Sequence, residues 1–308
     1  MKLSINIYRL AEKYGNTRAA LMSSKAGFSA CDYALNTLEK EDTPFRSENY
    51  REVAENIRRE IEEGGIVITQ THAPFRFSAK TWDTPSLFEE KVIPTIGRAI
   101  EITALLGATV AVVHPIHHPE YKGREEEMFL RNMDFYRRLI PYAKEYGVKI
   151  AIENMWQLDK LRGCCSLDTC GTTHEFIRYI DTLDSEYIVA CLDVGHVGLP
   201  NTNETVADFI YALGHDRLKA LHIHDNDYKS DAHLLPYMGK LNWADITRAL
   251  GEINYDGDFT YEVKNYLYAN ICDELAQVSV DFMGAVGKEL VRQIEVNRQK
   301  NCEEIKNG

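Results

Sequence analysis

The chain has 308 residues, of which 44% are hydrophobic and 27% charged, a balance typical of a globular protein with a large core. Its formal net charge of −12 repels polyanions and therefore disfavours nucleic acid as a partner. No apolar run approaches the roughly 18 to 20 residues of a membrane helix, and the N-terminus is too short and too polar for a signal peptide. Seven cysteines, an odd number spread over a long chain, indicate reduced thiols in a cytoplasmic protein.

Short runs of apolar and β-branched residues recur along the chain and predict strands. Most of these runs are continuous rather than alternating, as expected of parallel strands that are buried on both faces. The second run alternates only in part. The eight predicted strands are Leu3–Tyr8, Phe28–Ala34, Ile66–Thr71, Ala108–Val113, Val148–Ile152, Tyr187–Leu192, Leu218–Ile223 and Phe259–Val263.

Patterns with a helical period separate these strands, and several of them end at glycine, a common helix stop. The connections 39–49 and 156–171 are predicted as loops. The second holds Cys164, Cys165 and Cys170, which lack a matching CxxC pair and are interpreted as loop thiols rather than zinc ligands. The predicted helices cover 10–22, 50–63, 87–106, 125–146, a segment capped by Thr172 or Thr173, 205–213, 242–250 and 273–299.

The alternation of eight strands with eight helical patterns predicts an α/β fold, a (β/α)8 TIM barrel. We expect residues 1–308 to form a single domain with a C-terminal helix at about 273–299, a normal length for a barrel with insertions. A doubly wound open sheet fits the count less well. It would usually carry a glycine-rich phosphate turn after its first strand, and Tyr8-Arg9-Leu10-Ala11 is not one.

Most of the predicted strands end in, or are closely followed by, a carboxylate or an imidazole. In a TIM barrel the active site lies at the C-terminal ends of the strands, so these side chains are expected to meet at one mouth. In Asp193-Val194-Gly195-His196 the glycine removes side-chain bulk and lets the acid and the histidine converge just past the strand. The predicted mouth residues are His72, His114, Glu153, Asp193, His196, His222, Asp231, His233 and Glu262.

This set of side chains favours a metal site. A single histidine after a strand is often a hydrogen-bonded turn residue, and a single glutamate there often pairs with lysine or arginine. Several acids directed into one mouth, however, would repel one another strongly unless a cation neutralised them. Imidazole and carboxylate together suit a divalent ion, and a mixed site of this kind accepts manganese, cobalt, magnesium or zinc.

Seven short motifs contain these residues and occur in order over nearly the whole chain. The motifs are Thr71-His72-Ala73-Pro74, Val113-His114-Pro115, Ile152-Glu153-Asn154, Leu192-Asp193-Val194-Gly195-His196, Leu221-His222-Ile223-His224-Asp225, Asp231-Ala232-His233 and Tyr261-Glu262. Together they resemble the sugar phosphate isomerase/epimerase group of the xylose-isomerase-like TIM barrels. That superfamily includes ketose 3-epimerases, inosose-pathway enzymes and type IV apurinic endonucleases, and these motifs separate its activities poorly.

The resemblance implies roles for individual residues. It places one divalent metal among the side chains of Glu153, Asp193, His222 and Glu262, makes the two glutamates the acid–base pair, and brings His196 to a substrate oxygen. In the endonuclease branch a larger set holds three zinc ions, and this chain has a candidate for each ligand. Many sugar-isomerase relatives keep the same additional residues. The additional candidates for substrate binding or further metals are His72, His114, His196, Asp231 and His233.

The first functional hypothesis is a metal-dependent sugar isomerase or ketose epimerase that works by proton transfer through a metal-stabilised enediolate. One glutamate would remove a carbon-bound proton and the other would return it from the opposite face. Trp156 is a candidate for stacking on the sugar. Lys264, two residues past Glu262, is expected to bind a substrate hydroxyl or to pair with Glu153. The partner is then a small sugar, and the final helix and 39–49 are candidate surfaces for a homo-oligomer.

Two alternatives stay open. A metal-dependent lyase or dehydratase acting on a keto-sugar, cyclitol or glycoside begins with the same deprotonation, so the sequence does not separate it from the first hypothesis. A phosphodiesterase of the apurinic endonuclease type would use three metals. The net charge of −12 and the scattered basic residues disfavour it. The chain also has His224-Asp225-Asn226-Asp227 where the endonucleases carry Asn-Asp-Ser-Lys.

Overall fold

The computed structural model describes residues 1–308 except 41, 119–120, 201, 264–270 and 308, and it contains eight parallel strands in one sheet. The bounds of each strand fall inside a predicted run or within one residue of it, so the predicted positions of the eight strands are confirmed. The strands are β1 (Leu3–Asn6), β2 (Ala30–Ala34), β3 (Val67–His72), β4 (Val110–Val113), β5 (Lys149–Glu153), β8 (Ile188–Asp193), β9 (Leu218–His222) and β10 (Phe259–Tyr261).

The sheet curves round until its two ends meet. Its order is β10-β1-β2-β3-β4-β5-β8-β9, with every neighbouring pair parallel. A parallel bridge between Ile223, just after β9, and Tyr261 of β10 joins the ends. Two backbone hydrogen bonds support this bridge, one from Ile223 N to Thr260 O at 2.8 Å and one from Glu262 N to Ile223 O at 3.0 Å. The fold is therefore the predicted TIM barrel.

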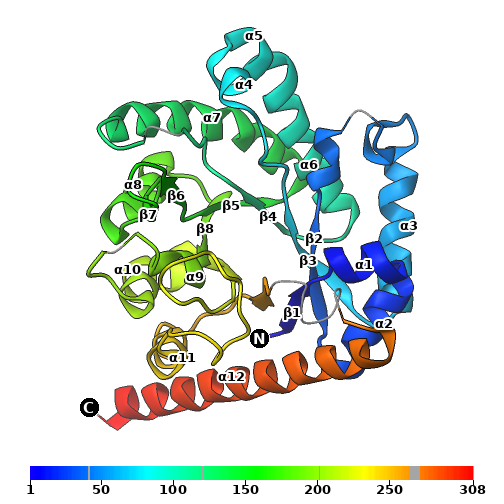
Figure 1. The fold of residues 1–308 in the computed structure, drawn as a ribbon, viewed down its shortest axis with the longest axis vertical. Helices are drawn as coiled ribbons and strands as arrows, with labels where there is room; N and C mark the ends of the chain where they lie inside the picture. Colours follow the sequence, from blue (N-terminus) through cyan, green and yellow to red (C-terminus); the bar gives the residue numbers. More distant parts are fainter. Residues whose placement is uncertain (41, 119–120, 201, 264–270, 308) are drawn as a thin grey trace.

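Helices surround the strands (Figure 1). The long α12 lies across α2 and α11 and continues past residue 299, the approximate end predicted from the sequence. Thr172 caps α8 by accepting a hydrogen bond from Glu175 N, as one of the two predicted caps should. The helices are α1 (Tyr8–Tyr14), α2 (Asn16–Ala26), η1 (Asn36–Glu39), η2 (Pro44–Arg46), α3 (Tyr50–Glu63), α4 (Ala79–Asp83), α5 (Pro85–Leu87), η3 (Phe88–Val92), α6 (Ile93–Leu105), α7 (Glu125–Tyr146), α8 (Thr173–Leu183), α9 (Val194–Val197), α10 (Val206–Arg217), α11 (Trp243–Glu252) and α12 (Asp273–Asn307).

Two apolar layers define the inside and the outside of the barrel wall. The larger lies between strands and helices and includes Ile150, Ile152 and Leu192. The smaller fills the barrel interior with small or branched side chains. Because side chains alternate along a strand, a residue two positions after an interior residue also faces inward. Four mouth residues stand in this position: His114, Glu153, Asp193 and His222. The interior residues are Val112, Ala151, Val189, Cys191 and Ala220.

The segment 156–171, predicted as a loop, contains an antiparallel hairpin of β6 (Trp156–Asp159) and β7 (Cys164–Leu167). Its tight turn explains the difference, because the Asp159 carboxylate accepts hydrogen bonds from the backbone N–H groups of Leu161 and Arg162, each at 3.0 Å. Gly163 completes the turn with a φ of 64°. In the described part of the chain, no helix combines the length and the apolar character needed to span a membrane.

Candidate metal centre and active site

All nine predicted mouth residues converge at the C-terminal ends of the strands, and the structure adds His224 to them. Three groups of their ligand atoms each lie within 4.8 Å of one another among the described residues. We name these groups the central cluster, the β3–β4 cluster and the loop cluster. The central cluster is Glu153, Asp193, His222 and Glu262, the β3–β4 cluster is His72, His114 and Glu153, and the loop cluster is His196, His224, Asp231 and His233.

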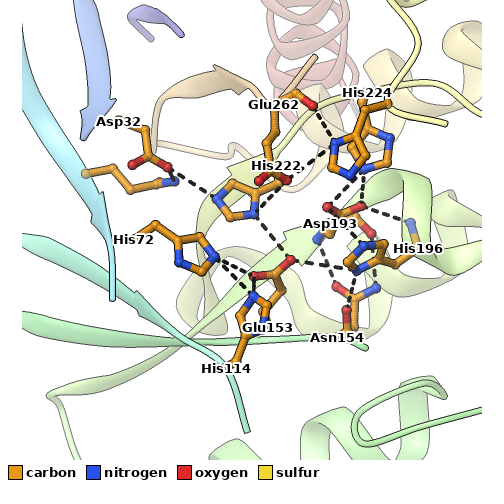
Figure 2. Close-up of polar contacts among 12 residues, drawn as sticks. Asp32, His72, His114, Glu153, Asn154, Asp193, His196, His222, His224 and Glu262 are labelled. Carbon is orange, nitrogen blue, oxygen red and sulfur yellow. Dashed lines mark hydrogen bonds and ion pairs between the residues drawn. The ribbon is translucent and has the colours of Figure 1, made fainter. Parts of the chain in front are cut away.

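The central cluster is built from strand ends. Glu153, Asp193 and His222 are the last residues of β5, β8 and β9, and Glu262 follows β10 directly. His222 Nδ1 lies 3.3 Å from Glu153 Oε1 and 3.5 Å from Glu262 Oε2. In Figure 2 the two glutamates reach this ring from below and from above. Glu262 is partly exposed whereas the other three are buried, so the cluster is open on the side of Glu262.

The β3–β4 cluster shares Glu153 with the central cluster. His114 Nε2 lies 3.0 Å from Glu153 Oε2 and 3.0 Å from His72 Nε2. His72 Nδ1 can donate to the carbonyl oxygen of Ala73 at 2.8 Å, which would leave its Nε2 lone pair directed at the other two groups. The Phe75 ring stacks on His114 with centroids 4.5 Å apart. Two imidazole nitrogens and a carboxylate oxygen thus face one point.

The loop cluster lies beyond the strands, on α9 and on the chain that follows β9. His233 Nδ1 is 2.6 Å from the carbonyl oxygen of Glu262, which orients its Nε2 toward Asp231 Oδ2 at 2.9 Å. His196 Nε2 lies 3.7 Å from the other oxygen of the same carboxylate. The His224 ring stacks on His233 with centroids 4.0 Å apart. The cluster therefore presents three imidazoles around one carboxylate.

Asn154 ties the ends of β5 and β8 together under these clusters. Its side chain donates to Asp193 O at 3.0 Å and accepts from Asp193 N at 2.8 Å. Its carbonyl oxygen lies 2.9 Å from His196 Nδ1. The Asp193 carboxylate accepts from His196 N at 2.9 Å, which caps the short helix α9. The predicted convergence of Asp193 and His196 is confirmed, with Asn154 holding both.

Gly195 permits this convergence for a second reason. A Cβ atom at this position would overlap the His224 ring. His224 is fully buried and its Nε2 lies 2.9 Å from Asp193 Oδ1. The ring therefore fills the space that the missing side chain leaves, directly beside the carboxylate.

Charges in the mouth compensate one another strongly. Burial alone would raise the pKa of Glu153, but His222 and His114 hold it well below its ordinary value. Burial would lower the pKa of His196, yet Asp193 and Asp231 raise it to about 10. Protons on the histidines thus balance the buried acids, and a divalent cation would take over that role by displacing them.

Unsatisfied buried atoms indicate that this donor set fits a cation. Among the described residues, Glu153 Oε2, His222 Nδ1, His222 Nε2 and His224 Nδ1 are buried without a well-formed hydrogen bond. The first three face oppositely charged groups at 3.0–3.4 Å, so their pairing is imperfect rather than absent, and imperfect pairing of buried polar atoms is unfavourable. Carboxylate oxygens and imidazole nitrogens at this spacing are the ligands that divalent zinc or manganese takes. The residues of the central cluster therefore fit the metal that the sequence predicts.

The sequence also suggested two further substrate-binding residues, Trp156 and Lys264. Trp156 lies on β6, half buried, with its ring 6.4 Å from that of His196 in an edge-on arrangement, so it borders the mouth. Lys264 lies outside the described residues. The sequence reasoning missed Asp32, a fully buried acid of β2 whose Oδ2 lies 3.4 Å from His222 Nε2. The sequence showed Asp32 only as an acidic residue inside the predicted strand Phe28–Ala34.

Comparisons with known proteins agree with this architecture. A family model described as "Xylose isomerase-like TIM barrel" matches residues 22–284. An uncharacterised protein of Methanocaldococcus jannaschii is 30% identical over 201 residues, covering 63% of this chain and 64% of its own. The D-psicose 3-epimerase of Enterocloster bolteae is 28% identical over 209 residues, covering 65% and 63%.

The probable endonuclease 4 of Bacillus licheniformis is 27% identical over 177 residues, covering 55% of each chain. These matches thus span between about half and just under two thirds of the relatives' lengths. A solved structure of a D-tagatose 3-epimerase-like protein superposes with a TM-score of 0.73 at 22% identity, covering 96% of this chain and 98% of that one. Since the family model covers most of the chain, the protein belongs to the xylose isomerase-like TIM barrel family.

Proposed function

We propose that this protein is a divalent-metal-dependent sugar isomerase or ketose epimerase. The observation that carries the proposal is the pair of glutamates in the central cluster. Glu153 and Glu262 both lie within 3.5 Å of His222 Nδ1 and approach it from different sides, as Figure 2 shows. Two carboxylates on either side of one binding point are what a proton transfer between opposite faces of a substrate carbon requires.

Each glutamate has a distinct position for this role. Glu262 is the more exposed and faces the open side of the cluster, where a sugar would enter. Glu153 lies deeper and is held ionised by His222 and His114, which keep its pKa well below the ordinary value. A divalent cation held by the central cluster would polarise a substrate carbonyl and stabilise the negative charge that develops when the proton leaves. His196 and Trp156 border the same space and are our candidates for contacts to the sugar.

The substrate class rests on relatives. The D-psicose 3-epimerase of E. bolteae and the D-tagatose 3-epimerase-like structure both carry ketose epimerase names. We therefore propose free or derivatised keto-sugars as substrates. A lyase acting on a similar compound would share the first deprotonation, and product analysis distinguishes the two reactions.

Solvent exchange tests the proposal. Metal-loaded protein is incubated with a panel of keto-sugars in heavy water, and deuterium incorporation at the substrate carbon is followed by NMR. We expect Glu262→Gln to lower the exchange rate by about 10²–10⁴-fold, because a positioned acid–base group contributes about that factor. The control is Glu289→Gln, on the exposed surface of α12, which should exchange like the wild type. Unchanged exchange in Glu262→Gln would remove Glu262 from the acid–base role.

A second candidate function is a metal-dependent phosphodiesterase, and the presence of three adjoining clusters favours it. If the β3–β4 cluster also held a cation, both oxygens of Glu153 would be used as ligands and none would be left to act as a base. The two functions therefore make opposite demands on Glu153. Metal content per chain, measured by mass spectrometry on protein purified without chelators, separates them. About one ion supports the epimerase, whereas about three zinc ions together with cleavage of abasic DNA would support the phosphodiesterase.

A further inference from the structure

Asp32 is a buried acid that the proposed chemistry does not use. It lies on β2, fully buried, and β1 and β10 separate β2 from β9 round the barrel. Its Oδ2 accepts a hydrogen bond from Gln70 Nε2 at 3.0 Å and lies 3.4 Å from His222 Nε2. Its Oδ1 has no hydrogen-bond partner among the described residues. A buried carboxylate with so few donors is destabilising, so its position calls for a compensating interaction.

His222 supplies that interaction across the barrel interior. The two nitrogens of its ring face opposite groups, with Nδ1 toward Glu153 and Glu262 and Nε2 toward Asp32. Figure 2 shows the ring between Asp32 on one side and the two glutamates on the other. The distance of 3.4 Å is slightly longer than the roughly 2.7–3.2 Å of a good N–H···O bond, so a small movement of the ring completes it.

The arrangement decides which nitrogen can bind a metal. A cation held among the two glutamates would displace the proton from Nδ1, and the carboxylate of Asp32 beside Nε2 would hold the remaining proton there. The Nδ1 lone pair then points into the central cluster. Gln70, itself buried, fixes Asp32 by donating from its side-chain amide, and so keeps the carboxylate aimed at His222.

We propose that Asp32 is a positioning residue that sets the tautomer of His222 and thereby raises the affinity of the central cluster for a divalent cation. The inference depends on the central cluster being a metal site and is independent of the reaction catalysed there. Outer carboxylates that orient a ligating histidine typically change metal affinity by about 10–100-fold. We expect an effect of this size from Asp32.

Metal affinity and histidine NMR test this proposal without any activity assay. Full-length protein is stripped of metal, and its affinity for Zn²⁺ is measured by competition with a chromogenic chelator. Asp32→Asn should bind Zn²⁺ about 10–100-fold more weakly than the wild type. Long-range ¹H–¹⁵N spectra of the Zn²⁺-loaded protein should show a hydrogen-bonded Nε2–H proton on His222 in the wild type and a weakened one in Asp32→Asn.

The control variant is Asp168→Asn, which removes another buried carboxylate that pairs with a histidine, His117, outside the three clusters. It should leave Zn²⁺ affinity within about twofold of the wild type. If Asp32→Asn does not fold, Gln70→Leu releases the same carboxylate from its donor and should weaken Zn²⁺ binding in the same direction. An unchanged affinity, or a weaker affinity with an unchanged Nε2–H signal of His222, would overturn the proposal. Neither result would bear on the exchange experiment with Glu262→Gln.

Discussion

The central cluster and the loop cluster use the same kinds of side chain but are held in different ways. Glu153, Asp193 and His222 are the last residues of paired parallel strands, so the hydrogen bonds of the sheet fix their backbones. Asp231 and His233 lie in the connection after β9 and are oriented by a few side-chain bonds, such as that between His233 Nδ1 and Glu262 O. His233 also adopts a positive φ of 45°, which is uncommon for a residue with a side chain.

Burial differs in the same sense between residues that end a strand and residues in the connection after β9. The side chains of His222 and Asp193 are inaccessible to solvent, whereas those of His233 and Asp231 are 18% and 22% exposed. Glu262, just after β10, and His224, which is buried, depart from this division. A site on rigid elements keeps its geometry when one outer contact is lost, while a site on loops depends on each contact. We therefore expect the chemistry that needs fixed distances at the central cluster and adjustable contacts at the loop cluster.

The largest expected effect comes from Glu153→Gln, which alters the residue shared by the central and β3–β4 clusters. Removing this charge leaves His72, His114 and His222 without their common acid, and breaking a buried charge pair is typically destabilising by about 3–5 kcal/mol. We also expect exchange activity to fall by about 10²-fold or more. Urea unfolding of the metal-free proteins and the deuterium exchange assay measure the two effects. A variant as stable as the wild type would contradict the compensating charges described for the mouth.

His224 of the loop cluster contacts Asp193 of the central cluster, and Gly195→Ala tests this contact. Its new Cβ would overlap the His224 ring, and overpacking of this kind is typically destabilising by about 1–3 kcal/mol. The double variant Gly195→Ala/His224→Ala should recover part of this loss, because the smaller side chain makes room. Chemical unfolding of the two single variants and the double variant gives the coupling free energy. Purely additive losses would show that the glycine is required for some other reason.

The independence of the loop cluster is tested by His233→Ala. None of the four donors of the central cluster is removed, so we expect the variant to keep the central ion and to retain exchange within about tenfold of the wild type. Metal analysis and the exchange assay check both points. A fall of about one ion per chain would show that the loop cluster holds an ion of its own, and would favour the phosphodiesterase.

Cys164→Ser tests the interpretation of the cysteines as loop thiols. The Cys164 thiol is exposed on β7, so its replacement should not affect metal content, and a loss of metal in this variant would overturn that interpretation.

The sequence predicted the barrel because most of its strands are continuous apolar runs, and a side-chain period of two then directs the acids and histidines at the strand ends inward. Thus Glu153, Asp193 and His222 could be predicted from the sequence to lie at the mouth of the barrel. Asp32 was missed because it lies within a strand rather than after it, and its partner His222 is far away in the sequence. Such a contact depends on the curvature of the closed sheet, which no local pattern contains.

The loops were harder to predict for a related reason. The β6–β7 hairpin has a mixed sequence, and its pairing depends on the turn that Asp159 and Gly163 form. His224 stood within a recognised motif, yet its role could not be seen there. It is defined by the stacking on His233 and by the space above Gly195, both of which arise from the way the chain returns after β9.

The smallest expected effect concerns a histidine–carboxylate pair outside the clusters, which provides a reference for those inside. His117 Nδ1 lies 2.5 Å from the buried Asp168 Oδ2, and this hydrogen bond raises the pKa of His117 above its ordinary value of 6.5. Because the folded state binds the proton more tightly, the pair stabilises the fold fully below about pH 6.5. That contribution is lost as the pH rises through the pKa of the folded protein.

The size of the effect is limited by exposure. The His117 side chain is half exposed, so water and salt screen the pair and its charge contributes at most about 1 kcal/mol. The difference in unfolding free energy between the wild type and His117→Gln should therefore be larger at pH 6 than at pH 9. Urea unfolding at the two pH values measures it, and a difference that grows with pH would contradict the sign. Because the neutral ring can still donate from Nδ1, some of the difference should remain at pH 9, which separates the charge from the hydrogen bond itself.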